Sequence, residues 1–361
     1  MVASLAVEQC AQAPVLTATA FPPWARQHNQ PVTYPRLFVE VAGERSIPPA
    51  MVLKAAGLRP DLLDDPAGRI SLIETWQIFD AVLNLTGDPA LGFETGQRLP
   101  LTAHGNLGYA LMCAPTAREA ILILQRFWHL RGRGSLLDVL EDDEGLTFEI
   151  RPELPMPELL QNFLFSSMLV SMYRGIGFVM GDAGLSAELR LAGEEPAGFS
   201  VWHKKLPPVS FGMHSAQLRI MGDKAALERP LPTANPEGLA HAIAMCERES
   251  SLMGGGGDPV LQRTRAALHP GENGYPDPGT IAKALHMTSR TFRRRLQEQG
   301  SSYMQLLEEA RRRDSCRLLA RPELEVQQIS ELLGYSDPAN FTRAFRHWMG
   351  KTPREWRMTD Q

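Results

Sequence analysis

The sequence has few cysteines and no pattern among them. Cys10, Cys113, Cys246 and Cys316 lie far apart in a chain of 361 residues, and no CxxC pair occurs. This spacing argues against a disulfide framework and against a zinc site built from cysteines. It is typical of a reduced compartment, so we expect a cytoplasmic protein without a metal.

An apolar run pure enough to cross a membrane is also missing. The most apolar stretch covers residues 159–180, and it contains Gln161, Asn162 and Arg174. We therefore expect a buried helix there and no membrane span. No Lys or Arg precedes Arg26, so a signal peptide is not expected either.

Residues 1–235 lack a recognisable catalytic constellation. Histidines at four positions have no partner four residues away and no carboxylate at motif spacing: His104, His129, His203 and His214. An enzyme fused to another module remains an alternative, but Cys113 and Cys246 have no motif histidine near them. We expect no catalytic residue, no metal and no cofactor.

Charge is distributed unevenly along the chain. The whole sequence has 37 Lys and Arg against 41 Asp and Glu, a formal net charge of −4. From Asp258 to the end we count 17 basic and 13 acidic side chains. A basic module joined to an acidic one is expected where one part meets phosphate. Chance composition could give the same modest excess, so charge alone leaves both interpretations open.

The part before the glycine run at residues 254–257 predicts an α+β domain. Apolar residues at helical spacing predict helices over residues 71–85, 116–128, 157–180 and 236–252. Two apolar runs around the turn Asp142–Gly145, followed by two later runs, predict strands over residues 136–140, 146–150, 188–191 and 217–221. Helices, then a hairpin, a helix and more strands indicate the α+β class.

The C-terminal quarter contains an internal repeat. Short apolar helices are predicted at 281–285 and 329–333, and each is followed by a turn and a helix with the pattern apolar-x-Arg-x-apolar. Thr288 and Asp337 stand where helix N-caps are expected, and Pro338 takes the first helical position. Each half is a helix-turn-helix signature, and two copies are far more specific than one.

A helix-turn-helix places its second helix in the major groove of DNA, where Arg can pair with guanine and Asn with adenine. Lys351 lies beyond the second such helix and is expected to contact phosphate. The structural alternative is a solvated basic face in a small helical domain. The candidate DNA-binding residues are Thr288, Ser289, Arg290, Thr291, Arg293, Arg294, Pro338, Ala339, Asn340, Thr342, Arg343, Arg346 and Lys351.

The predicted joining helix at residues 303–319 would be about 25 Å long. Together with the two half-domains, it could place the recognition helices about one turn of DNA apart, or about 34 Å. They would then enter successive major grooves on one face of the duplex.

Residues 278–357 resemble the DNA-binding domain of the AraC/XylS family of bacterial transcription regulators. The resemblance rests on Thr288-x-Arg290-Thr291-Phe292, Leu333-Gly334-Tyr335-Ser336-Asp337 and Gly350-Lys351-Thr352-Pro353, among other segments. Departures are Thr288 where Ser is usual and Ser315 where Ala usually packs. Upstream, the residues Gly105–Leu111, Thr116–Ala120 and Val209-Ser210-Phe211 are similar to the arabinose-binding-like N-terminal domain of the subgroup of ornithine-use and virulence regulators.

The resemblance implies a multidomain regulator. An α+β regulatory domain would precede an all-α DNA-binding domain with two helix-turn-helix units. It implies double-stranded promoter DNA and RNA polymerase as partners, usually for activation. The expected parts are an N-terminal extension over residues 1–30, an effector-binding domain over 31–235, a dimerisation helix over 236–253, a glycine-rich linker over 254–258 and the DNA-binding domain over 259–361.

A small effector is expected to bind among the aromatic residues of the N-terminal domain. Small-molecule sites are mostly apolar with a few polar contacts, and no cluster of like charge occurs here. We therefore expect an apolar or amphipathic effector. The alternatives are that these aromatics only form the core, and that the regulator responds to dimerisation or a protein partner without any ligand. The candidate effector residues are Trp76, Phe79, Tyr109, Trp128, Phe163 and Tyr173.

The expected dimerisation helix carries a narrow apolar stripe made of Leu239, Ala242, Ile243 and Cys246. Such a stripe can form the seam of a homodimer, or it can pack onto its own domain. The sequence leaves both possibilities open.

Overall fold

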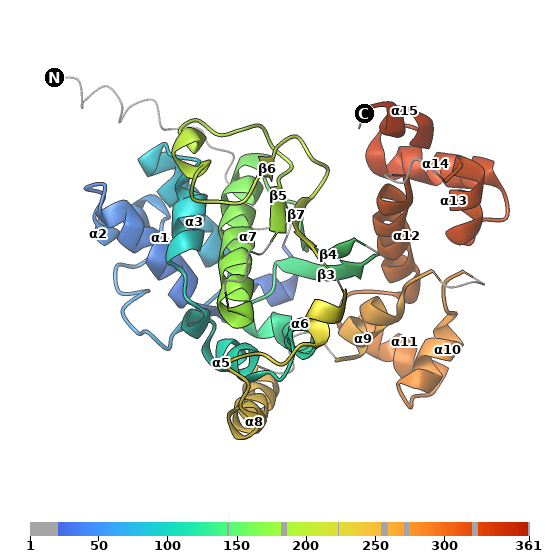
Figure 1. The fold of residues 1–361 in the computed structure, drawn as a ribbon, viewed down its shortest axis with the longest axis horizontal. Helices are drawn as coiled ribbons and strands as arrows, with labels where there is room; N and C mark the ends of the chain where they lie inside the picture. The colour runs from blue at the N-terminus through green and yellow to red at the C-terminus, as the bar shows by residue number, and fades with distance from the viewer. Residues whose placement is uncertain are drawn as a thin grey trace. The chain divides into compact units, whose positions relative to one another are not determined.

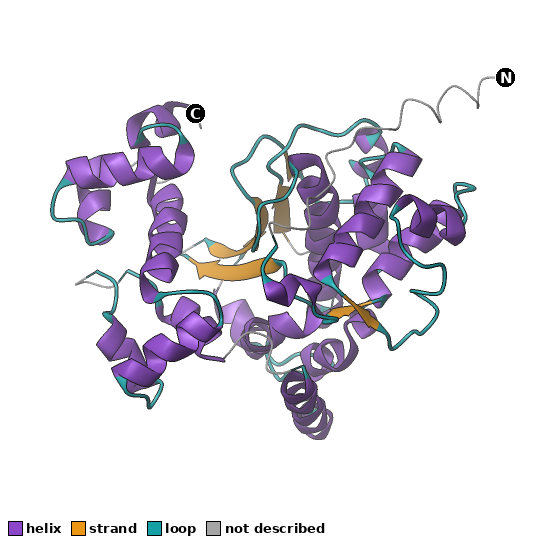
Figure 2. Ribbon diagram, turned by 180° about the vertical axis from the view of Figure 1, so that it is seen from behind, coloured by secondary structure: helices purple, strands orange, loops and turns teal. Residues whose placement is uncertain are grey.

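The computed structural model describes residues 21–142, 144–181, 186–222, 224–253, 259–270, 274–319 and 324–359. The chain divides into two compact units, Met1–Met253 and Gly254–Gln361 (Figure 1). The predicted glycine linker at 254–258 lies outside the described residues. In the described part of the chain, all named strands belong to the N-terminal unit (Figure 2).

The N-terminal unit combines eight named helices with seven named strands within the described residues. Its helices are α1 Thr33–Gly43, α2 Pro49–Ala55, α3 Leu72–Thr86, α4 Leu91–Arg98, α5 Gly105–Cys113, α6 Ala117–Phe127, α7 Glu158–Met180 and α8 Pro236–Leu252. Its strands are β1 Gln30–Pro31, β2 Arg69–Ile70, β3 Ser135–Glu141, β4 Gly145–Pro152, β5 Ser186–Arg190, β6 Val209–Ser210 and β7 Ala216–Met221. Short 3-10 helices include η3 Leu101–His104, η4 Trp128–Arg131 and η6 Lys224–Glu228.

Local signals set many of these boundaries. Ser71 forms a full capping box with Glu74 at the start of α3. Thr116 accepts a hydrogen bond from the backbone N–H of Glu119, so it caps α6. The predicted helix at 116–128 is slightly too long, because α6 ends at Phe127 and Trp128 begins the 3-10 helix η4.

A five-stranded sheet packs against the long helix α7. The strand order is β3-β4-β7-β5-β6, antiparallel except for the β5–β6 pair. The predicted hairpin is confirmed, with Leu137 opposite Ile150 and Val139 opposite Phe148. Figure 1 shows α7 between this sheet and helices α1 to α3. The α+β class predicted for this unit is thereby confirmed.

Helix α7 has the length and composition of a membrane-spanning helix. It is nevertheless the central core helix of this unit, because it packs against α3 and α4 and against strands β5 and β7. Phe163, Leu169 and Val170 on α7 are almost fully buried. The expectation of a buried helix over this stretch is confirmed.

Two glycines let α4 approach α7 closely. A Cβ atom at Gly92 would overlap the backbone carbonyl oxygen of Phe163, and one at Gly96 would meet the carbonyl oxygen of Ser167. Backbone atoms cannot move aside as a flexible side chain can. The close packing of the two helices therefore depends on these glycines.

We expect Gly92→Val to destabilise the N-terminal unit by about 1–3 kcal/mol, the usual cost of overpacking a core. Urea unfolding of the full chain measures this change. Gly43→Ala is the matched control, because a Cβ atom at Gly43 would meet nothing within 4 Å. Equal stability of the two variants would show that the α4–α7 packing is looser than described.

The described part of the predicted N-terminal extension packs onto the regulatory domain. Gln30 is buried in β1, which pairs with β2. The Arg133 guanidinium lies 3.7 Å from the ring centre of Trp24, and the ring of Phe21 meets the edge of Trp76. Residues 21–30 are thus part of the packing of this domain.

The apolar stripe of α8 also packs onto its own unit. Ala242 and Cys246 are buried, Leu239 and Ile243 are partly buried against the same core, and α8 packs along α5. Of the two possibilities left open by the sequence, packing within the domain is the one observed. The role of α8 as a dimerisation helix stays a prediction.

The C-terminal unit is all helical in the described residues. Its helices are α9 Pro259–Ala267, α10 Pro278–Ala284, α11 Ser289–Glu298, α12 Tyr303–Leu319, α13 Val326–Leu332, α14 Pro338–Met349 and α15 Pro353–Thr359. Two separate apolar clusters hold it together. One contains Phe292 and Leu296, and the other contains Phe341 and Phe345. Helix α12 contributes residues to both, so it joins two helix-turn-helix units as the sequence predicted.

Candidate nucleic-acid interface and domain cavities

The first recognition helix is α11. The Thr288 hydroxyl accepts a hydrogen bond from the backbone N–H of Thr291, so the predicted N-cap is confirmed. Phe292 and Leu296 point into the core, at 2% and 1% exposure. This anchoring leaves Arg290, Arg293 and Arg294 exposed, with Ser289 beside them at the helix start.

The second recognition helix is α14. Asp337 caps it through the backbone N–H of Ala339, and Pro338 occupies the first turn as predicted. Asn340 and Arg343 are exposed, and the Arg343 Nη2 donates to Asn340 Oδ1 over 2.6 Å. This bond leaves the other donors of the Arg343 guanidinium and the amide N–H groups of Asn340 available for contacts with a base.

The remaining predicted contacts are also at the surface. Pro338, Ala339, Arg346 and Lys351 are exposed, while Thr342 is half-buried and donates to the Pro338 carbonyl oxygen. Lys351 follows Gly350, which ends α14 in the left-handed conformation at φ 72°. Lys351 is therefore separated from the groove-facing side chains of α14.

Arg311 of α12 has a structural role in the second helix-turn-helix unit. Its Nε donates to the Leu333 carbonyl oxygen over 3.1 Å, and its Nη2 donates to that of Gly334 over 3.3 Å. Its guanidinium also lies 4.6 Å from the ring centre of Tyr335. Arg311 of α12 thus fixes the turn that precedes the second recognition helix.

We expect Arg290→Ala to change the base preference of the protein, because a lost bidentate base contact costs about 1–3 kcal/mol at one base pair. Lys351→Ala should instead weaken binding to all sequences alike and lower the salt slope by about one unit. Selection from a randomised duplex library at two salt concentrations separates these effects. An unaltered selected sequence for Arg290→Ala would refute its role as a base reader.

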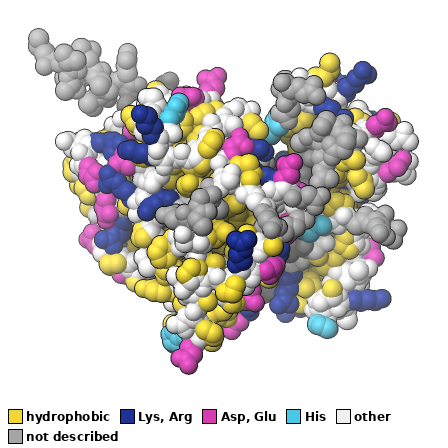
Figure 3. Space-filling model, viewed as in Figure 1, with side chains coloured by type: hydrophobic (Ala, Val, Ile, Leu, Met, Phe, Trp, Pro, Cys, Tyr) yellow, Lys and Arg dark blue, Asp and Glu magenta, His cyan; other side chains and the backbone are white. Residues whose placement is uncertain are grey.

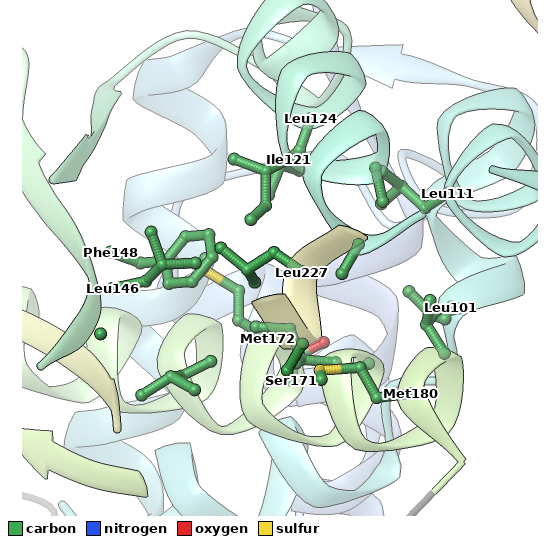
Figure 4. A pocket seen from close by; sticks show the side chains of 18 of the residues that line it. Leu101, Leu111, Ile121, Leu124, Leu146, Phe148, Ser171, Met172, Met180 and Leu227 are labelled. Atoms are coloured by element: carbon green, nitrogen blue, oxygen red, sulfur yellow. The ribbon is translucent and has the colours of Figure 1, made fainter. Parts of the chain in front are cut away.

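The N-terminal unit contains a cavity of about 160 Å³ with a mostly apolar lining, which we call the apolar cavity. For comparison, a cavity of about 150 Å³ accommodates benzene. Leu101, Leu111, Ile121, Leu124, Met172 and Met180 are among the side chains that line it, as Figure 4 shows. These come from η3, α5, α6 and α7, with Leu146 and Phe148 of β4 completing the wall.

A second cavity of about 150 Å³, which we call the polar cavity, lies next to the first. It adds polar side chains such as Gln30, Tyr34 and Thr75 to an aromatic lining. Five residues line both cavities and form the boundary between them: His104, Trp128, Arg131, Ser171 and Met172. Both cavities are lined mostly by apolar side chains, and the second has the larger polar share.

The structure brings together some of the predicted effector residues. Trp76, Phe79 and Trp128 line the polar cavity, and Trp128 also lines the apolar one. Phe163 is a core residue that stacks on Phe38. Neither it nor Tyr173 is among the lining residues of the two cavities, and Tyr109 is 52% exposed on α5. Sequence reasoning missed Tyr34, His104 and Arg131.

Burial keeps Tyr34 and His104 neutral. It raises the pKa of Tyr34 to about 12 and lowers the pKa of His104 to about 4, with the nearby Arg131 charge lowering the latter further. The Tyr34 hydroxyl lies 2.9 Å from His104 Nδ1, and Ser171 Oγ lies 3.4 Å from Nε2. At neutral pH this trio can exchange hydrogen bonds without carrying charge.

The outer surface of the N-terminal unit has mixed charge. The face seen in Figure 3 interleaves basic and acidic side chains on this unit. Many of them are paired, as where Arg45 contacts Asp88 and Glu94, and where Arg118 contacts Glu141. This pattern is typical of a solvated surface. The exposed arginines of α11 and α14 are therefore stronger candidates for phosphate and base contacts than the surface of the N-terminal unit.

Two capped helices, each at the second position of a helix-turn-helix and each presenting Arg or Asn outward, define a DNA-binding transcription regulator. Comparison with known proteins agrees. The family description "Arabinose-binding domain of AraC transcription regulator, N-term" matches residues 47–231, and a helix-turn-helix domain description matches residues 281–359. The chain belongs to the AraC family of transcription regulators.

Several individual relatives are similar to this chain over about three quarters of its length or more. The ornithine utilization regulator of Pseudomonas aeruginosa is 29% identical over 335 residues, covering 91% of this chain and 96% of its own length. A helix-turn-helix-type regulator of Mycobacterium tuberculosis is 30% identical over 349 residues, with 93% and 97% covered. The regulator VqsM of Pseudomonas aeruginosa is 38% identical over 280 residues, with 74% and 83% covered. Among solved structures, the regulator CdpR of Pseudomonas aeruginosa is 21% identical, with 89% and 98% covered and a TM-score of 0.43.

Proposed function

We propose that this protein activates transcription from promoters that it recognises with α11 and α14. The observation that carries this proposal is the exposure of Arg290 and Arg294 on one capped helix and of Asn340 and Arg343 on the other. Helix α12, 17 residues long, joins the two units and would hold their recognition helices in successive major grooves. RNA polymerase is the partner that an activator at a promoter would contact, and we propose a cytoplasmic location.

We further propose that a small effector occupies the cavities of the N-terminal unit. This proposal is supported by the lining of the cavities, which combines apolar side chains with a few polar groups, as is usual for small-molecule sites. One relative is named for ornithine utilization. We do not transfer ornithine to this chain, because its extra amine would add a cation beside the guanidinium of Arg131, which lines both cavities.

We propose a homodimer as the working form. The α8 stripe gives no support for it, since it is used within the unit. Support comes from Leu252 at the end of α8 and Tyr109 on α5, which remain 81% and 52% exposed on two packed helices and could be buried in a self-complementary contact. A dimer would present four helix-turn-helix units and gain affinity through effective concentration. Sedimentation showing only monomer, with and without DNA, would contradict it.

The proposed function is tested by capturing genomic fragments with the full chain and placing the captured promoter before a reporter gene. We expect the reporter to rise when the wild-type protein is present. The double variant Arg290→Ala, Arg343→Ala should lose this response, whereas Gly43→Ala should keep it. A reporter that falls with the wild-type protein would indicate repression, and one that responds equally to the double variant would refute the assignment of α11 and α14.

A further inference from the structure

A small charge cluster connects Arg131, which lines both cavities, to Glu249 of helix α8. The Glu249 carboxylate on α8 accepts hydrogen bonds from Arg69 over 2.5 Å and from Arg131 over 2.7 Å, both at Oε1. Asn106 reaches Oε2 at 3.4 Å. The side chains of Arg131 and Glu249 are only 12% and 20% exposed. One carboxylate therefore faces two guanidinium groups in a poorly hydrated place.

This cluster carries one uncompensated positive charge. The hydrogen-bonded charged groups are Arg69, Arg131 and Glu249, whose charges add to +1. Arg133, the other arginine that lines the polar cavity, is neutralised by Glu153. An unbalanced buried charge is costly, and a bound anion of single charge would balance it.

Arg131 also has a free hydrogen-bonding position. Within the described residues its Nε is buried and has no hydrogen-bond partner. Arg131 lines both the apolar and the polar cavity. Planar guanidinium groups bind carboxylates through two parallel hydrogen bonds, which are stronger than neutral ones. A carboxylate at this point would be matched both in charge and in geometry.

Arg131 is one of the lining residues of the apolar cavity, and most of the others are apolar. Figure 4 shows several of these: Leu101, Leu111, Ile121, Leu124, Met172 and Met180. A ligand whose head reaches Arg131 must therefore place its remainder against hydrocarbon. A second charge in the head group would overcompensate the cluster, and a cationic head would add to its excess. The fitting chemistry is a single apolar chain that ends in one carboxylate.

Glu249 could couple the binding of such a ligand to the end of helix α8. It lies near the end of α8, four residues before Met253, the last described residue ahead of the DNA-binding unit. Its bonds to Arg69 and Arg131, together with the contact of Ser250 with His129 at 3.0 Å, hold this end of α8 on the domain. A ligand carboxylate on Arg131 competes with Glu249 for the same guanidinium.

We propose that the effector is a straight-chain amphiphile with a carboxylate head, and that its carboxylate displaces Glu249 from Arg131 and loosens the end of α8. This inference rests on the proposed effector-controlled function and adds the chemical class of the effector and the contact that senses it. Helix α8 leads into the chain segment before the DNA-binding unit. Loosening of α8 would therefore transmit ligand binding to that unit.

The test uses calorimetric titration of the full chain with straight-chain carboxylates from hexanoate to tetradecanoate, below their micelle concentrations. Alcohols, amines and alkyl phosphates of the same chain lengths are the matched probes. We expect one carboxylate to bind about ten- to a hundredfold more tightly than the alcohol of equal length. Equal binding of carboxylate and alcohol, or tighter binding of the amine or phosphate, would overturn the proposal.

Variants then locate the contact. Arg131→Gln should weaken carboxylate binding about tenfold or more, whereas Glu249→Gln should strengthen it because the competitor is gone. Arg126→Gln is the matched control, since Arg126 also pairs with α8, through Glu247, but at the exposed surface. Unfolding would weaken binding in both variants, so it cannot explain weaker binding by Arg131→Gln together with stronger binding by Glu249→Gln. Unchanged affinity in both variants would overturn the proposal.

Hydrogen exchange of the α8 amides measures whether ligand binding loosens the end of α8. In the wild-type chain the carboxylate should speed exchange over residues 247–252, and in Glu249→Gln exchange should be fast without ligand. Slower or unchanged exchange on binding would overturn the coupling. If no carboxylate binds a chain that still binds its promoter, this inference fails while the DNA-binding function stands. Failure to bind any promoter would refute the proposed function instead.

Discussion

Asp314→Ala is expected to destabilise the C-terminal unit by about 3–5 kcal/mol, the usual cost of leaving one partner of a buried ion pair uncompensated. The side chains of Arg313 and Asp314 are only 4% and 2% exposed. Arg313 donates to both carboxylate oxygens of Asp314 and to the Leu268 carbonyl oxygen, and the Tyr275 hydroxyl donates to Asp314 over 2.7 Å. Removing the carboxylate leaves the buried Arg313 guanidinium without its counter-charge and the partly buried Tyr275 hydroxyl without its acceptor.

Chemical unfolding of the full chain, followed by circular dichroism, measures this loss. Glu309→Ala is the matched control on the same helix α12, because Glu309 pairs with Arg265 at a partly exposed site and should cost less than about 1 kcal/mol. The paired replacement Arg313→Met, Asp314→Leu should recover much of the stability lost by Asp314→Ala. A cost below that of the control would show that the buried pair does not hold α12 to Leu268 and Tyr275.

Phe345→Ala is expected to cost about 3–5 kcal/mol and to disable the second helix-turn-helix unit. Phe345 is fully buried, and its ring lies 5.8 Å from that of Phe341 and 5.6 Å from that of Trp356, both edge-on. Truncation leaves a cavity under α14, so the face that carries Asn340 and Arg343 is no longer supported.

Footprinting on a bound promoter, combined with thermal unfolding, measures the effect. The half of the footprint made by the second unit should disappear, while the first unit keeps its own core around Phe292. Leu332→Ala is the control, because Leu332 on α13 is 40% exposed and its loss should change stability by no more than about 0.5 kcal/mol. A full footprint in Phe345→Ala would contradict the assignment of α14 as a recognition helix.

The sequence predicts the C-terminal unit well because its signals are local. The caps Thr288 and Asp337 act on residues two or three positions away, and the apolar spacing of Phe292 and Leu296 follows from one turn of helix. The helix predicted at 303–319 matches α12 residue for residue. Short-range chemistry of this kind needs no knowledge of the rest of the fold.

The cavities could not be predicted in the same way, because their residues meet only in the folded domain. Arg131 and Glu249 are 118 positions apart, and their contact depends on α8 lying along α5. Tyr109 and Trp128 look alike as aromatic residues in helical segments, yet one is exposed and the other lines both cavities. Whether such a residue is exposed or lines a cavity depends on the elements packed against its helix, and the periodicity of the sequence does not identify those elements.

The central claim is that one chain reads DNA with two recognition helices, and selection from a randomised duplex library by the full-length protein tests it most directly. We predict selected duplexes with two short constant blocks whose centres lie about one helical turn apart, about 10 base pairs. Arg290→Ala should erase only the block read by α11, and the double variant Asn340→Ala, Arg343→Ala only the block read by α14. Selection that enriches no sequence, or a single block that survives both sets of substitutions, would contradict the account.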